Sequence, residues 1–186
     1  MAEKKATEAP KINKLCQPQL EVPEGYILLS GPIESDNIVN GPGLRAVVWT
    51  QGCRQHCPGC QNPETWSESL EDGTLVKIDE VKEELRKLRG QAGLTFCGGE
   101  PLLQAKACLE ITKFAKEELG WNVWSFTGLI LEQIPHDSEA WAFVEELDAL
   151  IDGPFIQAQR DLSVKFRGSR NQRLLHLNHG KIVSQE

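Results

Sequence analysis

Cysteine side chains at three neighbouring positions are the residues of this chain best suited to chemistry. Cys53, Cys57 and Cys60 follow the spacing Cys-x3-Cys-x2-Cys. Cysteine thiolates bind soft metal ions and iron–sulfur clusters. A cube of four irons held by three cysteines leaves one iron with an open coordination position, and an open position is where a metal centre does chemistry. Three cysteines are therefore suited to a four-iron, four-sulfur (4Fe–4S) cluster with one open iron.

Zinc and disulfide bonds are the alternatives for these thiols. Structural zinc takes four protein ligands, and His56 is a poor fourth ligand because it adjoins Cys57 in the sequence. Cys97 or Cys108 would complete a four-ligand set, so a zinc-binding module stays open. Disulfides form in secreted proteins, and no signal peptide marks this chain as secreted. Cys16 lies in a polar N-terminal stretch, where we expect an exposed spare thiol.

A second motif follows a later strand. Leu94–Phe96 is an apolar run, and Cys97-Gly98-Gly99-Glu100-Pro101 comes directly after it. Two glycines let a ligand approach the backbone closely and leave amide groups free to bind it. The carboxylate of Glu100 is an acceptor for an ammonium group. Alone this motif marks a turn into a helix; beside the cysteine loop it predicts an amine-binding site, with Cys97 as a small strand-end filler.

The composition is that of an ordinary globular domain. The chain has 186 residues, 40% of them hydrophobic and 25% charged, which predicts one domain with a sizeable core. A net charge of −7 argues against nucleic acid as the main partner, because phosphate binding needs a basic surface. No apolar run has membrane-spanning length, so we expect a cytoplasmic protein. Residues 1–23 lack periodicity and predict a flexible tail, followed by one domain over 24–186.

Apolar runs and helical periodicity alternate along that domain. Strands are expected at 25–30, 44–50, 94–96, 121–126, 147–153 and 174–177, and helices at 77–89, 102–119 and 138–146. Recurring strand–loop–helix units predict a parallel sheet with crossover helices. The length is short for an eight-unit barrel, so we expect a partial, open α/β barrel of four to six units. Cys108 falls on the apolar face of its helix and is expected in the core. Thr127, at a strand end, is expected either to touch a ligand or to cap a helix.

The cysteine loop and the Gly-Gly-Glu-Pro motif together resemble the radical S-adenosylmethionine (SAM) superfamily. Additional motifs resemble, within it, the activating proteins of anaerobic (class III) ribonucleoside-triphosphate reductase. The matching segments span residues 25–176 and are Asn40–Arg45, Gln51–Cys53, Cys57–Cys60, Asn62, Thr65-Trp66, Thr127-Gly128, Asp152–Phe155, Arg160-Asp161 and Arg167–Arg173. One departure is Gly59, where many superfamily members carry an aromatic residue near the adenine.

The resemblance implies a mechanism and a set of site residues. Cys53, Cys57 and Cys60 would hold the 4Fe–4S cluster, and Gly98, Gly99 and Glu100, with Thr127, would bind SAM. One electron from a flavodoxin or ferredoxin would cleave SAM to methionine and a 5′-deoxyadenosyl radical. That radical would take a hydrogen atom from a glycine of the reductase, leaving a glycyl radical there.

The same resemblance suggests where the protein substrate binds. An open barrel leaves one edge uncovered, and the predicted contacts there are Asn40, Gly41, Gly43, Arg45, Arg167 and Arg173. The rival enzymes are an activase of another glycyl-radical enzyme and a radical SAM enzyme for a small molecule of the deazapurine type. The rivals from other classes are an iron–sulfur electron carrier and the zinc-binding module. An electron carrier would normally close its cluster with a fourth cysteine.

Overall fold

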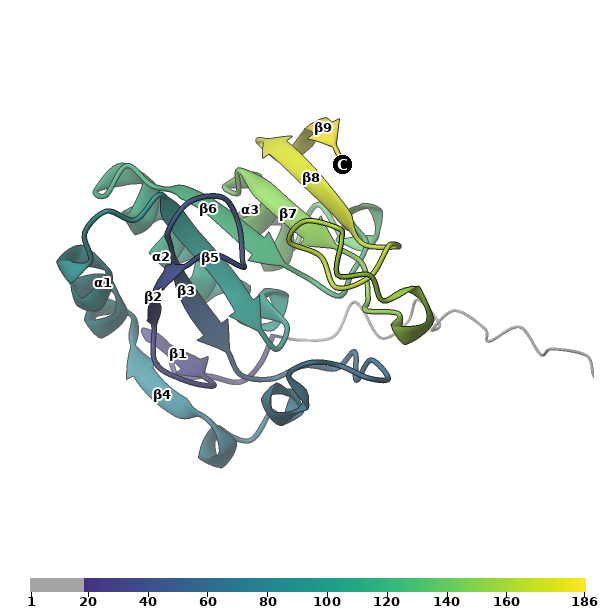
Figure 1. Cartoon of the computed structure of the whole chain (residues 1–186). Helices are drawn as coiled ribbons and strands as arrows, with labels where there is room; N and C mark the ends of the chain where they lie inside the picture. The colour runs from purple at the N-terminus through teal and green to yellow at the C-terminus, as the bar shows by residue number, and fades with distance from the viewer. Residues whose placement is uncertain (1–18) are drawn as a thin grey trace, which may run out of the picture.

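A nine-stranded sheet is the centre of the computed structural model, which describes residues 19–186 (Figure 1). Its strand order is β4-β1-β3-β5-β6-β7-β8-β9, with β2 paired to β3 beside this path. The strands are β1 (Tyr26–Leu29), β2 (Glu34–Asn37), β3 (Arg45–Thr50), β4 (Thr74–Lys77), β5 (Gly93–Gly98), β6 (Asn122–Phe126), β7 (Ala149–Asp152), β8 (Arg173–Asn178) and β9 (Lys181–Gln185). The described sheet ends at β4 and β9 and does not close into a barrel.

The middle of the sheet is parallel and its flanks are antiparallel. β3, β5, β6 and β7 run parallel, and α1 (Ile78–Lys87), α2 (Ala105–Glu117) and α3 (Glu139–Glu145) lie in the connections between them. β1 and β8 pair antiparallel with the two outer parallel strands. The mixed α/β class is thus confirmed, with four parallel strands at its centre, whereas the antiparallel additions were not predicted.

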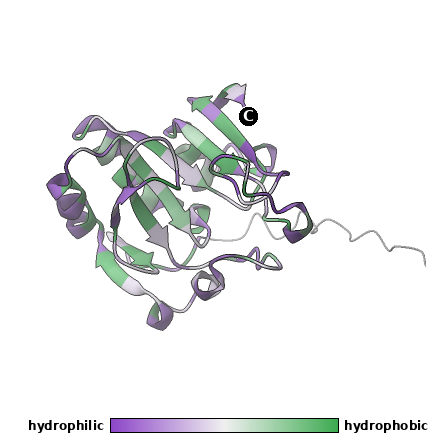
Figure 2. Cartoon of the chain, in the orientation of Figure 1, coloured by the Kyte–Doolittle hydropathy of each residue, from purple (hydrophilic) through white to green (hydrophobic). Residues whose placement is uncertain are grey.

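The three helices cover one face of the sheet, as Figure 1 shows. α1 illustrates why they form: Ile78, Val81 and Leu85 recur on one side and are buried. Acidic residues in its first turn and basic residues in its last turn complement the helix dipole. Apolar residues therefore gather on the strands, parts of which are coloured green in Figure 2, and on the inner helix faces.

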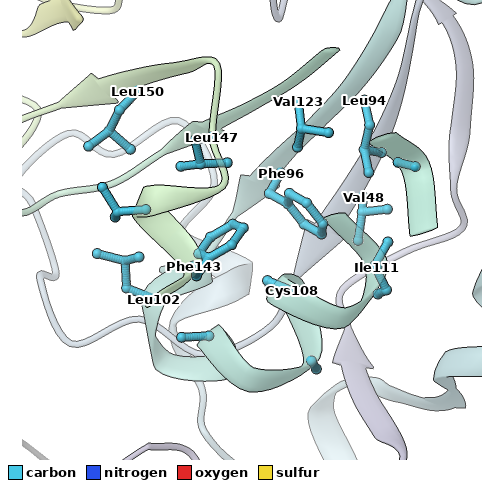
Figure 3. Close-up of a cluster of buried hydrophobic side chains, with 14 of the residues drawn as sticks. Val48, Leu94, Phe96, Leu102, Cys108, Ile111, Val123, Phe143, Leu147 and Leu150 are labelled. Carbon is cyan, nitrogen blue, oxygen red and sulfur yellow. The ribbon is translucent and has the colours of Figure 1, made fainter. Parts of the chain in front are cut away.

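Cys108 belongs to this core. It is fully buried on α2 among the side chains in Figure 3, between Ile111 of its own helix and Phe143 of α3. Its thiol lies 3.6 Å from the Pro101 carbonyl oxygen. The expectation that Cys108 is a core residue is confirmed.

Arg45 is buried on the opposite face of the sheet, and 0% of it is exposed. Its guanidinium donates to Thr95 Oγ1 at 2.7 Å, to Asn122 Oδ1 at 2.8 Å and to the Leu94 carbonyl at 2.6 Å, and it lies over the ring of Trp124. Burial lowers the pKa of this guanidinium to about 10. Arg45 therefore ties three strands together from inside, which contradicts its predicted contact with a partner.

The rest of the predicted partner turn lies at the wrong end of the strands for that contact. Asn40 and Gly41 are buried, and Gly43 is exposed. The turn precedes β3, whereas the cysteine loop follows it, so the two lie at opposite ends of the parallel strands. Gly41 is required here because a Cβ on it would lie 2.6 Å from Arg45 Cδ.

The N-terminal boundary of the domain lies earlier than predicted. Residues 1–18 of the expected tail lie outside the described residues, but Gln19 and Leu20 are attached to the domain. Gln19 bonds the Leu102 carbonyl and the Ala105 amide, and the Leu20 amide donates to the Leu103 carbonyl at 2.8 Å. Among the described residues, no helix is long and apolar enough to cross a membrane.

This attachment yields a prediction about truncation. A protein that begins at Gln19 keeps the hydrogen bonds of Gln19 and Leu20 and serves as the reference. One that begins at Val22 loses three hydrogen bonds to the loop after Glu100 and should be less stable by about 1–3 kcal/mol. Equal midpoints for the two truncated proteins would show that the Gln19 and Leu20 contacts add nothing.

Candidate functional site

The predicted site residues meet at one edge of the sheet. The cysteine loop follows β3, Gly99 and Glu100 follow β5, Thr127 follows β6 and Gly153 follows β7. These four strands are parallel neighbours, so their carboxyl ends lie side by side (Figure 1). This edge is where α/β folds bind their ligands.

The cysteine loop is braced by the residues that follow it. Arg54 forms an ion pair with Glu68 at 2.6 Å, and the ring of His56 stacks on Trp66 with centroids 4.7 Å apart. Buried Gln51 donates from its side chain to two carbonyls of the same returning segment, at 3.0 and 3.2 Å. The loop therefore has a defined path around its three thiols.

Backbone amides point at all three cysteine sulfurs. The Asn62 amide lies 3.4 Å from Cys60 Sγ. The amides of Gln55 and His56 bond the sulfur of Cys53, and the amide of Phe155 bonds that of Cys57. Hydrogen bonds of this kind stabilise cluster-bound thiolates and tune iron–sulfur centres. The thiols and their surroundings therefore fit a cluster.

A single metal ion fits this loop less well. Among residues 19–186, no three His, Cys, Asp or Glu side chains are grouped so as to hold one ion. A four-iron cluster does not require that grouping, since each cysteine binds a different iron. Burial is the main reason that the pKa of the Cys53 thiol is raised to about 12, so cluster binding must displace its proton.

Gly98 and Gly99 join the two loops. The Gly99 amide donates to the Thr50 carbonyl and the Glu100 amide to the Gly52 carbonyl, both at 2.8 Å. A Cβ on Gly98 would lie 2.5 Å from the Thr50 oxygen, and one on Gly99 would lie 2.3 Å from the Gly52 oxygen. Glycine is thus required by contact between the loops. The amides of Gly99 and Glu100 are occupied, contrary to the expectation that they stay free for a ligand.

Glu100 is buried, with 3% of its surface exposed. Its carboxylate accepts from the Leu102 amide at 3.2 Å, from the Gly128 amide at 2.8 Å and from the Thr127 hydroxyl. Thr127 in turn accepts from the Leu129 amide at 3.0 Å. A carboxylate has about four acceptor positions, so one remains for a further donor. Burial raises the pKa of Glu100 to about 7, and a bound cation would favour its charged form.

This burial predicts a pH dependence for the metal-free protein. The pKa of folded Glu100 is about 7 against 4.5 for an exposed glutamate, so the stability contributed by its protonated form is complete below pH 4.5 and is lost as the pH rises from 4.5 through 7. Glu100→Gln should match wild type at about pH 4 and exceed its free energy of unfolding by up to about 3 kcal/mol above about pH 8. Urea unfolding at both pH values measures this. The control is Glu117→Gln, at an exposed position on α2; coinciding Glu100→Gln and wild-type profiles would contradict the prediction.

The predicted basic patch lies at the same edge but is largely paired within the chain. Arg173 binds the carboxylate of Asp152, which is 1% exposed, and that of Glu132 at 2.7 Å. Arg170 pairs with Asp161 at 2.6 Å. Arg167 donates to the Glu186 carbonyl and stays partly exposed. Arg173 is therefore a structural residue, whereas Arg167 bonds the backbone carbonyls of Lys165 and Glu186.

Comparisons with known proteins agree with this geometry. The profile of a family described as "4Fe-4S single cluster domain" matches residues 39–175. An anaerobic ribonucleoside-triphosphate reductase-activating protein of Vibrio cholerae is 36% identical over 143 residues, which are 73% of this chain and 90% of that protein. Its Escherichia coli namesake is 33% identical over 146 residues, 76% of this chain and 94% of that protein.

The chain belongs to the anaerobic ribonucleoside-triphosphate reductase-activating protein family. A shorter similarity, 40% identity over 91 residues, links this family member to a pyruvate formate-lyase-activating enzyme of Clostridium pasteurianum, over 46% of this chain and 37% of that enzyme. The crystal structure of QueE from Escherichia coli matches at a TM-score of 0.48 and 17% identity, over 56% of this chain and 53% of that one.

Several residues of this family member's site escaped the sequence reasoning. Gln104 is buried and its side chain joins β1 to the cysteine loop, bonding the Leu28 and Gln51 carbonyls, both at 2.9 Å. Phe155 contributes its backbone amide, which bonds the sulfur of Cys57. A glutamine in a helical stretch and a backbone amide carry no sequence signal for such roles. The apolar run that precedes Phe155 could have placed it at the site edge but not beside Cys57.

Proposed function

We propose that this chain activates anaerobic ribonucleoside-triphosphate reductase by using a 4Fe–4S cluster and SAM to install a glycyl radical on it. The observation that carries the proposal is the loop of three cysteines whose sulfurs accept backbone amides, beside the buried carboxyl of Glu100. Relatives of this name match the chain over about three quarters of its length.

Cys53, Cys57 and Cys60 would hold the cluster. When bound, the reduced cluster would supply the electron for cleavage of SAM to methionine and a 5′-deoxyadenosyl radical, and this radical would take a hydrogen atom from the reductase glycine. The residues of the chain bind and orient. Arg54 and His56 keep the loop in place through Glu68 and Trp66.

Glu100 is the proposed partner of the SAM ammonium group. Its remaining acceptor position and its burial favour a cation, because the charge-assisted bond forms away from water. Gly98 and Gly99 keep this loop against the cysteine loop, so the ammonium and the cluster would be neighbours. Thr127 would act by orienting the Glu100 carboxylate.

The fold and partners complete the proposal. The four parallel strands form a partial radical SAM barrel, whose open side the reductase covers, with Arg167 as the remaining accessible candidate for contact. A flavodoxin or ferredoxin supplies the electron, because the cluster type reaches potentials as low as about −700 mV. The activase domain includes Gln19, which precedes the predicted boundary at residue 24.

The test is anaerobic reconstitution with iron and sulfide, followed by SAM and dithionite. The expected products are methionine and 5′-deoxyadenosine. Addition of anaerobic ribonucleoside-triphosphate reductase should then produce a glycyl radical signal in electron paramagnetic resonance. SAM cleavage without that signal would assign a different substrate, such as another glycyl-radical enzyme or a small molecule. A cluster that never cleaves SAM would indicate an electron carrier.

A further inference from the structure

The segment that follows β7 forms one wall of the cysteine loop. The Phe155 amide bonds the sulfur of Cys57. Two residues on, the side chain of Gln157 packs against Gly59, where an added Cβ would lie 2.8 Å from Gln157 Cδ. The segment 153–157 therefore contacts the cysteine loop at two points, although nearly a hundred residues separate them in sequence.

Three side chains from residues 169–172 hold this segment. Ser169 Oγ accepts from the Ile156 amide at 3.2 Å. Asn171 Nδ2 donates to the Pro154 carbonyl at 2.7 Å, and Gln172 Nε2 donates to the Gly153 carbonyl at 3.1 Å. The three hydrogen bonds flank Phe155 on both sides, so they determine where its amide points.

These side chains are themselves fixed in place. Ser169 is 0% exposed. Gln172 Oε1 accepts from the amides of Gly168 at 2.9 Å and Ser169 at 3.2 Å, so its side-chain amide is bonded at both ends. The ring of Phe155 covers Gly168, where a Cβ would lie 3.1 Å from Phe155 Cδ2. The segment 167–173, whose spacing suggested no mechanism, thus forms a compact support.

We infer that Ser169, Asn171 and Gln172 are positioning residues that tune the cluster through the Phe155 amide on Cys57. This inference rests on the proposed function, in which Cys57 binds the cluster. A hydrogen bond to a ligand sulfur stabilises negative charge there, and the reduced cluster carries one more negative charge than the oxidised one. Loss of the bond therefore lowers the reduction potential of the cluster.

Neutral substitutions test this without changing the charge near the cluster. The variants are Ser169→Ala, Asn171→Leu and Gln172→Met, with Leu162→Ala as the control at a position that is 75% exposed in the same loop. The reconstituted full-length proteins are titrated with dithionite in the presence of mediators, each cluster gaining one electron, and followed by electron paramagnetic resonance. We expect the equilibrium constant for reduction of the cluster to fall roughly tenfold in the three variants, which lowers the reduction potential by about 59 mV. The reduction potential of the control should not change.

Ser169→Ala removes a single oxygen atom and keeps the test valid if the larger changes prevent folding. Faster loss of iron to a chelator in the variants than in Leu162→Ala would support the same inference. Variants that assemble the cluster with the wild-type potential would overturn it. A wild-type protein that assembles no four-iron cluster would instead overturn the proposed function, and this inference with it.

Discussion

Replacement of Cys53, Cys57 or Cys60 by Ala is expected to abolish the cluster. Each thiol is one of three ligands on a loop that offers no substitute, and a backbone amide already points at each sulfur. After anaerobic reconstitution, each variant should lack the brown colour and bind little iron, and SAM cleavage should fall by several orders of magnitude. Iron and sulfide analysis with visible absorption measures this directly.

Cys108→Ala is the matched control for this experiment. The Cys108 thiol is fully buried under the sheet, so its removal should leave the cluster intact while lowering the free energy of unfolding by about 1 kcal/mol. Cys97→Ala should also keep the cluster. Loss of the cluster in Cys97→Ala would point to a four-cysteine site and argue against SAM chemistry.

Arg173→Glu should severely destabilise the fold, so its main effect is on stability rather than on the binding of a partner. Arg173 forms ion pairs with buried Asp152 and with Glu132, and Asp152 Oδ2 also accepts from the Leu131 amide at 2.9 Å. Removal of one member of such a pair leaves a buried carboxylate uncompensated, which costs about 3–5 kcal/mol. Urea unfolding of the metal-free protein measures the loss.

Arg167→Glu is the counterpart at the same edge of the sheet. Arg167 is partly exposed and bonds the backbone carbonyls of Lys165 and Glu186, so reversal of its charge should change stability by less than about 1 kcal/mol. If this surface meets the reductase, the glycyl radical yield should fall while SAM cleavage survives. An Arg173→Glu protein as stable as Arg167→Glu would show that the Asp152 pair does not support the fold.

The central elements of the fold were predictable because their residues carry strong periodic signals. The apolar run at 44–50 is β3, and the helical pattern at 77–89 is α1, which ends two residues earlier. β2 and β9 were missed because Glu34–Asn37 is entirely polar and Lys181–Gln185 is exposed along its length. β4 was missed because its four residues run directly into α1. Strand direction at the flanks depends on pairing between distant segments, which no local pattern encodes.

The candidate site was predictable only where side chains supply its chemistry. The cysteine spacing and the Gly-Gly-Glu motif identified the residues of two loops. The roles of Gly98 and Gly99 required the structure, since the distance that excludes a side chain is measured to the backbone of the other loop. The pairing within the basic run required the structure for a related reason: Arg173 pairs with Asp152 and Arg170 with Asp161, and no local spacing encodes these pairs.

The bond between Phe155 and Cys57 has a consequence for biosynthesis. At about 5–20 residues per second, the ribosome releases Phe155 roughly 5–20 s after Cys57. During that interval the nascent chain displays its thiols without the wall that later covers them. Assembly of the cluster in a finished loop therefore has to wait until the chain has been made at least as far as Phe155.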